Sequence, residues 1–286
     1  MPNAKVPTIA RIVLGAETCA SEHGYHVVLS YDGANPDYQI EQLRRLVEIN
    51  LDGLIIYPDA NNLQREEFLC LLRRCVSHGI PLVLVDRYLP GLEVSCVLSD
   101  NVEGMYRATE HLIMMGRRRL GLLAFGPEGG VSDRDRRKGF LDALRDHGLN
   151  PKAVLEAELG VCDLEISSRR AAETWLSRHA GGLPIDGVAC MEDNMAYGAY
   201  LALRAAGLNV PEDVAMVGYD NLDREIYQAA GLALTSIDQP AEQIGYEALR
   251  HLLERIGSGE PQAPVRHLLL KGNLVVRRSS GIESVA

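Results

Sequence analysis

The chain has 286 residues, 47% of them hydrophobic, and a formal net charge of −10. This length allows one large core or two lobes of ordinary domain size, and no apolar run approaches the roughly 18 residues that a membrane helix needs. The acidic balance argues against independent binding to DNA, because a domain that holds DNA by itself normally presents basic side chains to the phosphates.

The N-terminal segment predicts a helix of the mature fold rather than a signal peptide, because Arg11 and Glu17 interrupt its apolar stretch. The six cysteines include no C-x-x-C pair, and Cys96 and Cys190 fall in apolar segments that predict buried strands. We therefore expect small core thiols in a cytoplasmic protein, with a disulfide as the alternative.

Short apolar strands alternate with amphipathic helices along almost the whole chain, and glycine often stands between a helix and the next strand. This pattern is typical of βαβ units in a parallel sheet. The predicted elements are helix 10–23, strand 25–30, helix 37–49, strand 53–57, helix 65–78, strand 81–86, helix 101–115, strand 120–125, helix 134–147, strand 154–158, helix 163–178, strand 187–191, helix 193–206, strand 214–219 and strand 234–237. The alternation is long enough for an α/β fold with two doubly wound parallel-sheet lobes.

The start of this pattern lacks one element. A parallel sheet of this kind normally opens with a strand, whereas this sequence enters the helix at 10–23 almost directly. We expect the first strand of the N-terminal lobe to be missing because the sequence is truncated or its start codon is assigned too late. The alternative is a chain that evolved without this strand.

Polar residues gather at the carboxyl ends of most predicted strands, which is where ligands bind in open α/β sheets. In the segment from Pro211 to Pro240, Asp220 follows one strand and Gln239 follows the next. The clusters are Tyr57-Pro58-Asp59, Asp86-Arg87, Ser99-Asp100-Asn101, Met191-Glu192-Asp193, Tyr219-Asp220-Asn221 and Gln239. Converging carboxylates and guanidinium groups supply the donors and acceptors that a sugar needs.

Some of these residues also suit purely structural roles. Asp100 suits the N-cap of the helix at 101–115, with Glu103 completing a capping box, and Asp193 suits the N-cap of the next helix. Asp86 could simply orient Arg87. The recurrence of polar clusters at six strand ends nevertheless favours a binding site.

Motifs of known catalysis are absent from the sequence. No G-x-G-x-x-G, P-loop, H-E-x-x-H or G-x-S-x-G occurs, and no histidine has metal-ligand spacing with cysteine. We therefore predict no catalytic residue, no metal and no cofactor. Asp86, Glu192 and Asp220 leave a glycoside-active enzyme as an alternative, although binding of hydroxyl groups needs the same carboxylates.

Three segments of the sequence resemble the LacI/GalR (lactose-repressor-like) family of transcriptional regulators. They are Glu110-His111-Leu112 with Gly116–Arg119, the segment from Pro211 to Asp220, and Leu274–Ser279. The resemblance implies a periplasmic-binding-protein type I-like fold, an N-terminal lobe of residues 1–100 with 241–265, and a C-terminal lobe of residues 101–240 with 266–286. It also places the family's DNA-binding helix-turn-helix upstream of residue 1.

The resemblance further implies an effector site at the strand ends. Its residues are Tyr57, Asp86, Arg87, Arg136, Leu164, Glu192, Asp220 and Gln239, with Thr8 and Ile9 at the mouth. At the position of Leu164 the family often has an aromatic residue, and at the position of Glu192 it often has asparagine. These two differences favour a modified or amino sugar, or a small cationic ligand, over a plain hexose. Without the resemblance, Arg136 at a helix start is equally consistent with a solvated first turn.

The implied function is effector sensing. Binding of the effector would close the two lobes, and a homodimer would transmit this movement to a DNA-binding headpiece. DNA would be bound only through that headpiece, and no membrane partner is expected. The helix at 101–115 carries apolar residues on more than one face, among them Leu112, Met114 and Met115, which suits a dimer or a helix buried on two sides. A transport- or chemotaxis-type sugar-binding protein is the alternative function.

Overall fold

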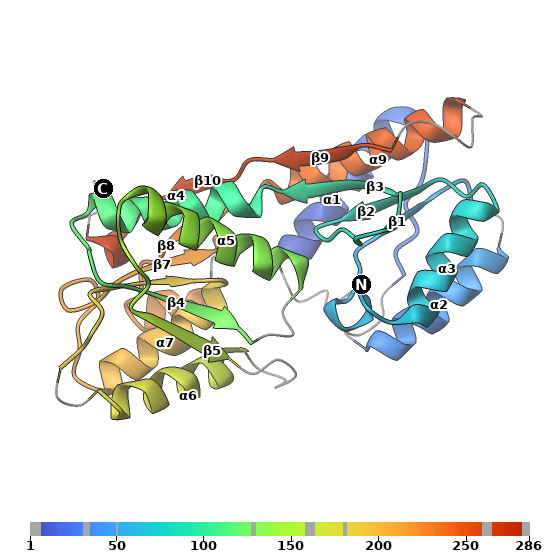
Figure 1. Ribbon diagram of the computed structural model, residues 1–286. Helices are drawn as coiled ribbons and strands as arrows, with labels where there is room; N and C mark the ends of the chain where they lie inside the picture. Colours follow the sequence, from blue (N-terminus) through green and yellow to red (C-terminus); the bar gives the residue numbers. More distant parts are fainter. Residues whose placement is uncertain are drawn as a thin grey trace. The chain divides into compact units, whose positions relative to one another are not determined.

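The computed structural model describes residues 7–30, 35–49, 51–126, 130–157, 164–179, 182–222, 224–258 and 265–281. The chain forms two compact units (Figure 1). Unit 1 consists of Met1–Ser99 and Pro240–Leu270, and unit 2 consists of Asp100–Gln239 and Lys271–Ala286.

Unit 1 contains a sheet of four parallel strands within the described residues. Their order is β1 (Leu54–Ile56), β2 (Leu82–Val85), β3 (Ser95–Ser99) and β9 (His267–Leu270). The helices of this unit are α1 (Pro7–His23), α2 (Pro36–Glu48), η1 (Ala60–Asn62), α3 (Glu66–Ser77) and α9 (Ala241–Ser258). All of these strands run in one direction, so their carboxyl ends meet at one edge of the sheet.

The alternation of side chains along β2 explains the layers of unit 1. Val83 and Val85 belong to the core cluster formed with α1 and α9, whereas Leu82 and Leu84 belong to the cluster formed with α2 and α3. Every residue of β2 is therefore buried. A parallel strand covered on both faces is expected to be apolar throughout, as this one is.

Unit 2 contains a larger, mostly parallel sheet, with six strands among the described residues. The order of its described strands is β10 (Asn273–Val275), β8 (Thr235–Asp238), β7 (Ala215–Tyr219), β6 (Gly187–Cys190), β4 (Leu120–Phe125) and β5 (Ala153–Ala157). Only the pair of β10 with β8 is antiparallel among these. The helices are α4 (Asn101–Met114), α5 (Val131–Asp146), α6 (Leu164–Ser177), α7 (Asp193–Ala205), α8 (Glu225–Ala229) and η2 (Arg278–Ser280).

Most predicted elements are confirmed within about three residues at their ends, but the strand predicted at 25–30 is wrong. Residues 25–30 form no strand ladder, and the side chain of Val28 is 83% exposed. A strand is defined by backbone pairing with a neighbour, so apolar composition alone does not produce one. Among the described residues this segment has no paired strand beside it.

The contacts of the structure place the last division of the chain a few residues later than the lobe boundary after residue 265 that the resemblance implies. His267–Leu270 pair in parallel register with Cys96–Ser99 of unit 1. Residues 266–270 therefore belong with unit 1, because the ladder to β3 fixes them there, and the division falls after Leu270.

The cysteines of the described residues are free thiols, as the sequence led us to expect. Cys96 and Cys190 are fully buried in β3 and β6. Burial raises the pKa of Cys96 to about 12 and also raises that of Cys190, so both remain protonated. Cys162 lies outside the described residues.

Two glycines allow α1 and α9 to pack with their backbones in close contact. A Cβ atom at Gly15 would lie 1.8 Å from the Glu242 carbonyl oxygen, and one at Gly245 would lie 1.8 Å from the Ile12 carbonyl oxygen. Neither position can take a side chain without separating the two helices. This contact forms one layer of unit 1.

We expect Gly245→Ala to lower the free energy of unfolding by about 1–3 kcal/mol, because the added methyl group overpacks the contact with α1. Urea denaturation followed by circular dichroism measures this. The control is Gly257→Ala in the same helix, where a Cβ atom meets nothing within 4 Å. That substitution should raise stability by about 0.5–1 kcal/mol, since it replaces glycine in a helix. Equal effects of the two substitutions would contradict the close-packing account.

Candidate ligand-binding site

In unit 2, the turn after β7 has an unusual backbone conformation. Asp220 and Asn221 have φ angles of 107° and 50°. Residues other than glycine adopt positive φ at an energetic cost, so the surrounding contacts must fix them. The Asp220 N–H donates to the Ile237 carbonyl at 2.8 Å, and Arg277 donates to the Asn221 Oδ1 at 2.7 Å. The turn thereby holds the Asp220 carboxylate at the carboxyl end of the strand.

Arg136 reaches this turn from the second turn of α5. Its side chain is only 6% exposed. It donates to the Asn101 Oδ1 at 2.8 Å and to the Met191 carbonyl at 2.5 Å. One guanidinium nitrogen lies 3.7 Å from the Asp220 Oδ1, and the guanidinium carbon lies 3.8 Å from the centre of the Tyr219 ring. The planar group is thus fixed by hydrogen bonds, an ion pair and an aromatic face.

The charge on Arg136 is balanced by carboxylates. Burial alone would lower the pKa of Arg136, but the negative charge of Asp220, with smaller contributions that include Glu192, raises it. The guanidinium therefore stays protonated. The Gln239 amide also donates to the Asp220 Oδ1. Arg136, Asp220 and Gln239, all in the predicted ligand set, are brought together here, and the negative charge of Glu192 contributes to raising the pKa of Arg136.

Asp193 has a different role from the one predicted. It is not the N-cap of α7, a position that Glu192 occupies. Instead its carboxylate accepts from the Leu222 N–H and from the Ser236 hydroxyl, each at 2.7 Å. These partners lie 29 and 43 residues away in the chain, so no local pattern could have indicated them. Burial, reinforced by the charge of Asp220, raises the pKa of Asp193 to about 8.

Asp100 does have the capping role that the sequence allowed. Its carboxylate accepts from the Glu103 N–H at 3.0 Å and begins α4. The neighbouring Asn101, which was not in the predicted ligand set, is the residue that Arg136 binds.

In unit 1, Tyr57, Asp86 and Arg87 form a second polar group at the ends of β1 and β2. Arg87 donates to the Pro58 carbonyl at 2.7 Å, and its guanidinium carbon lies 5.0 Å from the centre of the Tyr57 ring. Its Nε lies 3.8 Å from the Asp86 Oδ2. Asp86, like Asp220, follows its strand with a positive φ, here 66°.

The amide side chain that supports this group was not among the predicted site residues. Gln39 of α2 donates to the Tyr57 carbonyl at 3.1 Å and accepts from the Asp59 N–H at 2.9 Å. Its side chain therefore determines the path of the chain after β1. An isolated glutamine in an amphipathic helix resembles a solvent-facing residue, which is why it was missed.

The other predicted residues do not join a polar cluster. Thr8 and Ile9 are buried in the first turns of α1, and Ile9 packs in the apolar core of unit 1. Leu164 is the first residue of α6 and packs against the core of unit 2.

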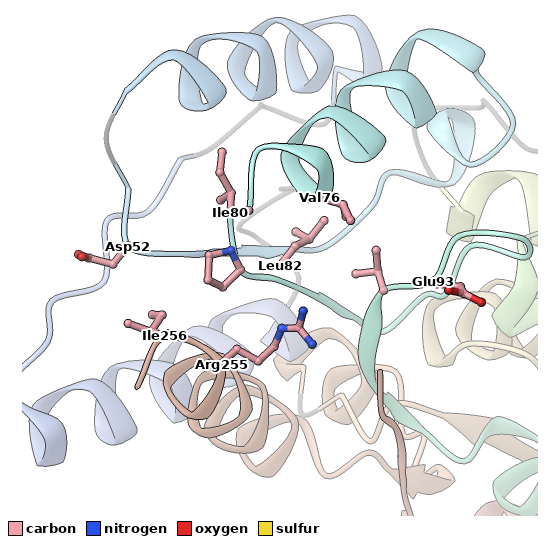
Figure 2. A pocket seen from close by; sticks show the side chains of 10 residues that line it. Asp52, Val76, Ile80, Leu82, Glu93, Arg255 and Ile256 are labelled. Carbon is pink, nitrogen blue, oxygen red and sulfur yellow. The ribbon is translucent and has the colours of Figure 1, made fainter. Parts of the chain in front are cut away.

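A cavity of about 200 Å³ lies elsewhere in unit 1 (Figure 2). Pro81 and Leu82 line it at the amino end of β2, and Val94 lines it just before β3. Arg255 extends into the same region from α9. Tyr57, Asp86 and Arg87 lie at the opposite, carboxyl ends of β1 and β2, so this cavity is not the predicted site.

Two parallel-sheet lobes with polar groups at the strand ends define the type I periplasmic-binding-protein fold. Residues 1–270 match the family model described as periplasmic binding proteins and sugar binding domain of LacI family. The chain belongs to this family and is the effector-binding domain of a LacI-family regulator. The chain is thus a domain of a transcriptional regulator and not an enzyme.

Individual relatives agree with this assignment. The chain is 35% identical to the HTH-type transcriptional regulator CelR of Thermobifida fusca, over 96% of the chain and 76% of that protein. It is 32% identical to the HTH-type transcriptional regulator MalR of Streptomyces coelicolor, over 98% of the chain and 78% of that protein. A solved CelR–cellobiose complex superposes with a TM-score of 0.80 at 31% identity, covering 96% of this chain and 79% of the other.

The described residues were also searched for membrane-spanning helices and for metal-binding groups. None of their helices has the length and apolar character required to cross a membrane. Their His, Cys, Asp and Glu side chains form no group of three or more that could hold a metal ion.

The raised pKa of Asp193 predicts a specific dependence of stability on pH. In the folded protein the pKa is about 8, against an ordinary value of 3.8. Between these values the folded state retains a proton that the unfolded chain releases, so stability falls as pH rises, by at most about 1.4 kcal/mol per pH unit. Asp193→Asn, which keeps the size and one acceptor oxygen, should reduce this slope.

Urea denaturation at pH 5, 6.5 and 8 measures the slope for the wild type and for Asp193→Asn. Glu173→Gln, a change at a half-exposed carboxylate on α6, serves as the control and should keep the wild-type slope. Parallel pH profiles for the wild type and Asp193→Asn would show that Asp193 is ionised at neutral pH in the folded protein.

Proposed function

We propose that this chain senses a sugar or modified sugar and transmits that binding to a DNA-binding headpiece located upstream in the full-length cytoplasmic regulator. The observation that supports this most is the buried group formed by Arg136, Asp220 and Gln239 at the carboxyl ends of the strands of unit 2. Carboxylate, amide and guanidinium groups fixed in this way can bind several hydroxyl groups with little loss of side-chain entropy.

The proposed ligand set comes from both units. It comprises Thr8, Ile9, Tyr57, Asp86, Arg87, Arg136, Leu164, Glu192, Asp220 and Gln239. The bound cellobiose in the CelR complex supports a carbohydrate as the ligand class. Glu192 adds a negative charge that favours an amino sugar or another cationic ligand. The ligand would change the equilibrium between arrangements of the lobes, and a dimer would carry that change to the headpiece.

We expect Asp220→Asn to weaken ligand binding about 10- to 150-fold, because a charge-assisted hydrogen bond contributes about 1.5–3 kcal/mol. Isothermal titration with cellobiose, glucose, ribose and glucosamine measures the effect. Arg136→Ala should also lower the melting temperature of the ligand-free protein, since it leaves buried partners without hydrogen bonds. Asp220→Asn retains the shape of the side chain but removes the counter-ion of Arg136, so the melting temperature of each ligand-free variant is measured beside its affinity.

Two controls accompany this titration. Glu173→Gln on the surface of unit 2 should bind like the wild type, and Glu192→Gln should reduce binding of glucosamine more than that of glucose. If one of the sugars binds the wild type and Asp220→Asn binds it equally well, the proposed site is wrong. Equal loss for glucosamine and glucose in Glu192→Gln would contradict the preference for a cationic ligand.

We also propose a homodimer that includes α4. Leu112 and Ile113 of this helix are buried in the core of unit 2, whereas Met114 is 69% exposed. Exposed methionine at a helix end beside other apolar residues is typical of a contact surface.

Sedimentation at micromolar concentration should therefore give about twice the chain mass of 31.4 kDa. Met114→Glu should weaken the dimer at least about tenfold, because it places a charge in an apolar contact. Ile226→Glu, at another exposed apolar position of unit 2, should leave the dimer intact. A wild-type monomer, or equal effects of both substitutions, would argue against this interface.

A further inference from the structure

The cavity of about 200 Å³ in unit 1 combines apolar walls with charged side chains of both signs (Figure 2). It lies at the amino ends of β2 and β3, whereas Asp86 and Arg87 follow the carboxyl end of β2. The described residues that line it include none of the proposed ligand set. They come from unit 1 alone, namely from residue 52, the last turn of α3, residues 79–82, residues 93–94 and the last turn of α9.

The walls of this cavity are mostly apolar. Leu82 and Val94 are 3% and 5% exposed, and Ile80 and Ile256 also line the cavity. Val76 is 46% exposed, so the apolar lining extends from the core of the unit to its surface. An apolar cavity of about 150 Å³ holds benzene, so this one accommodates a ligand of about eight or nine non-hydrogen atoms.

Three charged residues determine which polar groups such a ligand should carry. Figure 2 shows Arg255 between Asp52 on one side of the cavity and Glu93 on the other. A guanidinium group binds a carboxylate with two parallel hydrogen bonds, and a carboxylate binds an ammonium group through charge-assisted hydrogen bonds. A simple anion would meet two negative charges here, and a simple cation would meet Arg255. A ligand that carries both charges avoids both conflicts.

We propose that this cavity binds a small zwitterion with an apolar side chain, such as leucine or valine. The ligand carboxylate binds Arg255, the ammonium group lies toward Glu93 or Asp52, and the apolar side chain contacts Leu82 and Val94. This site is separate from the proposed sugar site. Its occupation connects the ends of α3 and α9 with the amino end of the sheet, and it therefore stabilises unit 1.

Isothermal titration at pH 7 tests the ligand chemistry with leucine and three analogues that each lack one part of it. Leucine should bind with a dissociation constant of about 1 mM or lower, which is the range open to a ligand of this size. The analogues are 4-methylpentanoate without the ammonium group, isopentylamine without the carboxylate, and glycine without the apolar side chain. Each should bind at least about tenfold more weakly than leucine.

Variants of the chain test the location of the site. Arg255→Gln should weaken leucine binding at least about tenfold, because it removes the charge that binds the carboxylate. Arg250→Gln is the matched control, since Arg250 lies in the same helix, pairs with Glu247 and does not line the cavity. Val76→Phe is the second variant. It should fill part of the cavity and weaken leucine binding by a similar factor, while its half-exposed position preserves the melting temperature of the ligand-free protein.

The proposal is overturned if neither leucine nor valine binds the wild type at concentrations up to about 10 mM. It is also overturned if leucine binds Arg255→Gln or Val76→Phe as tightly as it binds the wild type. Asp220→Asn should retain the affinity for leucine, because Asp220 lies in unit 2. Loss of leucine binding in Asp220→Asn would show that leucine occupies the proposed sugar site instead, and this would also contradict the proposal.

Discussion

The neutralisation of one buried guanidinium group organises the candidate site of unit 2. A charge as deeply buried as that of Arg136 is tolerated only with hydrogen bonds and a counter-ion. Four groups from three segments surround it: Asn101 at the start of α4, the Met191 carbonyl after β6, and the Tyr219 ring with the adjacent Asp220 carboxylate at the end of β7. Each of these groups lies at a strand end or helix start. The requirement of a single side chain therefore ties together elements that are far apart in the sequence.

The two units share the same local arrangement at the end of a buried strand. In each, an aspartate directly after a buried strand has a left-handed backbone, Asp86 in unit 1 and Asp220 in unit 2. In each, an arginine lies near that carboxylate and over a tyrosine ring, Arg87 over Tyr57 and Arg136 over Tyr219. The sharp change of direction that positive φ provides places the carboxylate at the strand end instead of continuing the sheet. Rigid strands and a constrained turn together give a preorganised carboxylate in both places.

The sequence was informative where structure depends on local pattern and less so where it depends on distant partners. Helix boundaries such as Asp37–Ile49 were predicted well because capping residues and glycines lie beside them. Residues 25–30 have the composition of a strand but no paired strand among the described residues. The resemblance implied that residues 267–270 belong to the C-terminal lobe, because it gave no sign of their pairing with β3, about 170 positions earlier. Arg136 and Asp220 were predicted through family resemblance. The roles of Gln39 and Asp193 depend on partners 18 to 43 residues away, which no local motif specifies.

The hydrogen bond from Arg277 to Asn221 has a consequence for the order of events during synthesis. Arg277 also donates to the Leu234 carbonyl, and the Ser279 hydroxyl donates to the Met216 carbonyl. The turn with Asp220 and the strands around it are therefore completed by residues 43 to 63 positions later in the chain. A nascent chain that ends at Gln239 contains Arg136, Asp220 and Gln239 but lacks these hydrogen-bond partners. The turn that carries Asp220 therefore gains its full set of hydrogen bonds only after residues 277–280 have been synthesised.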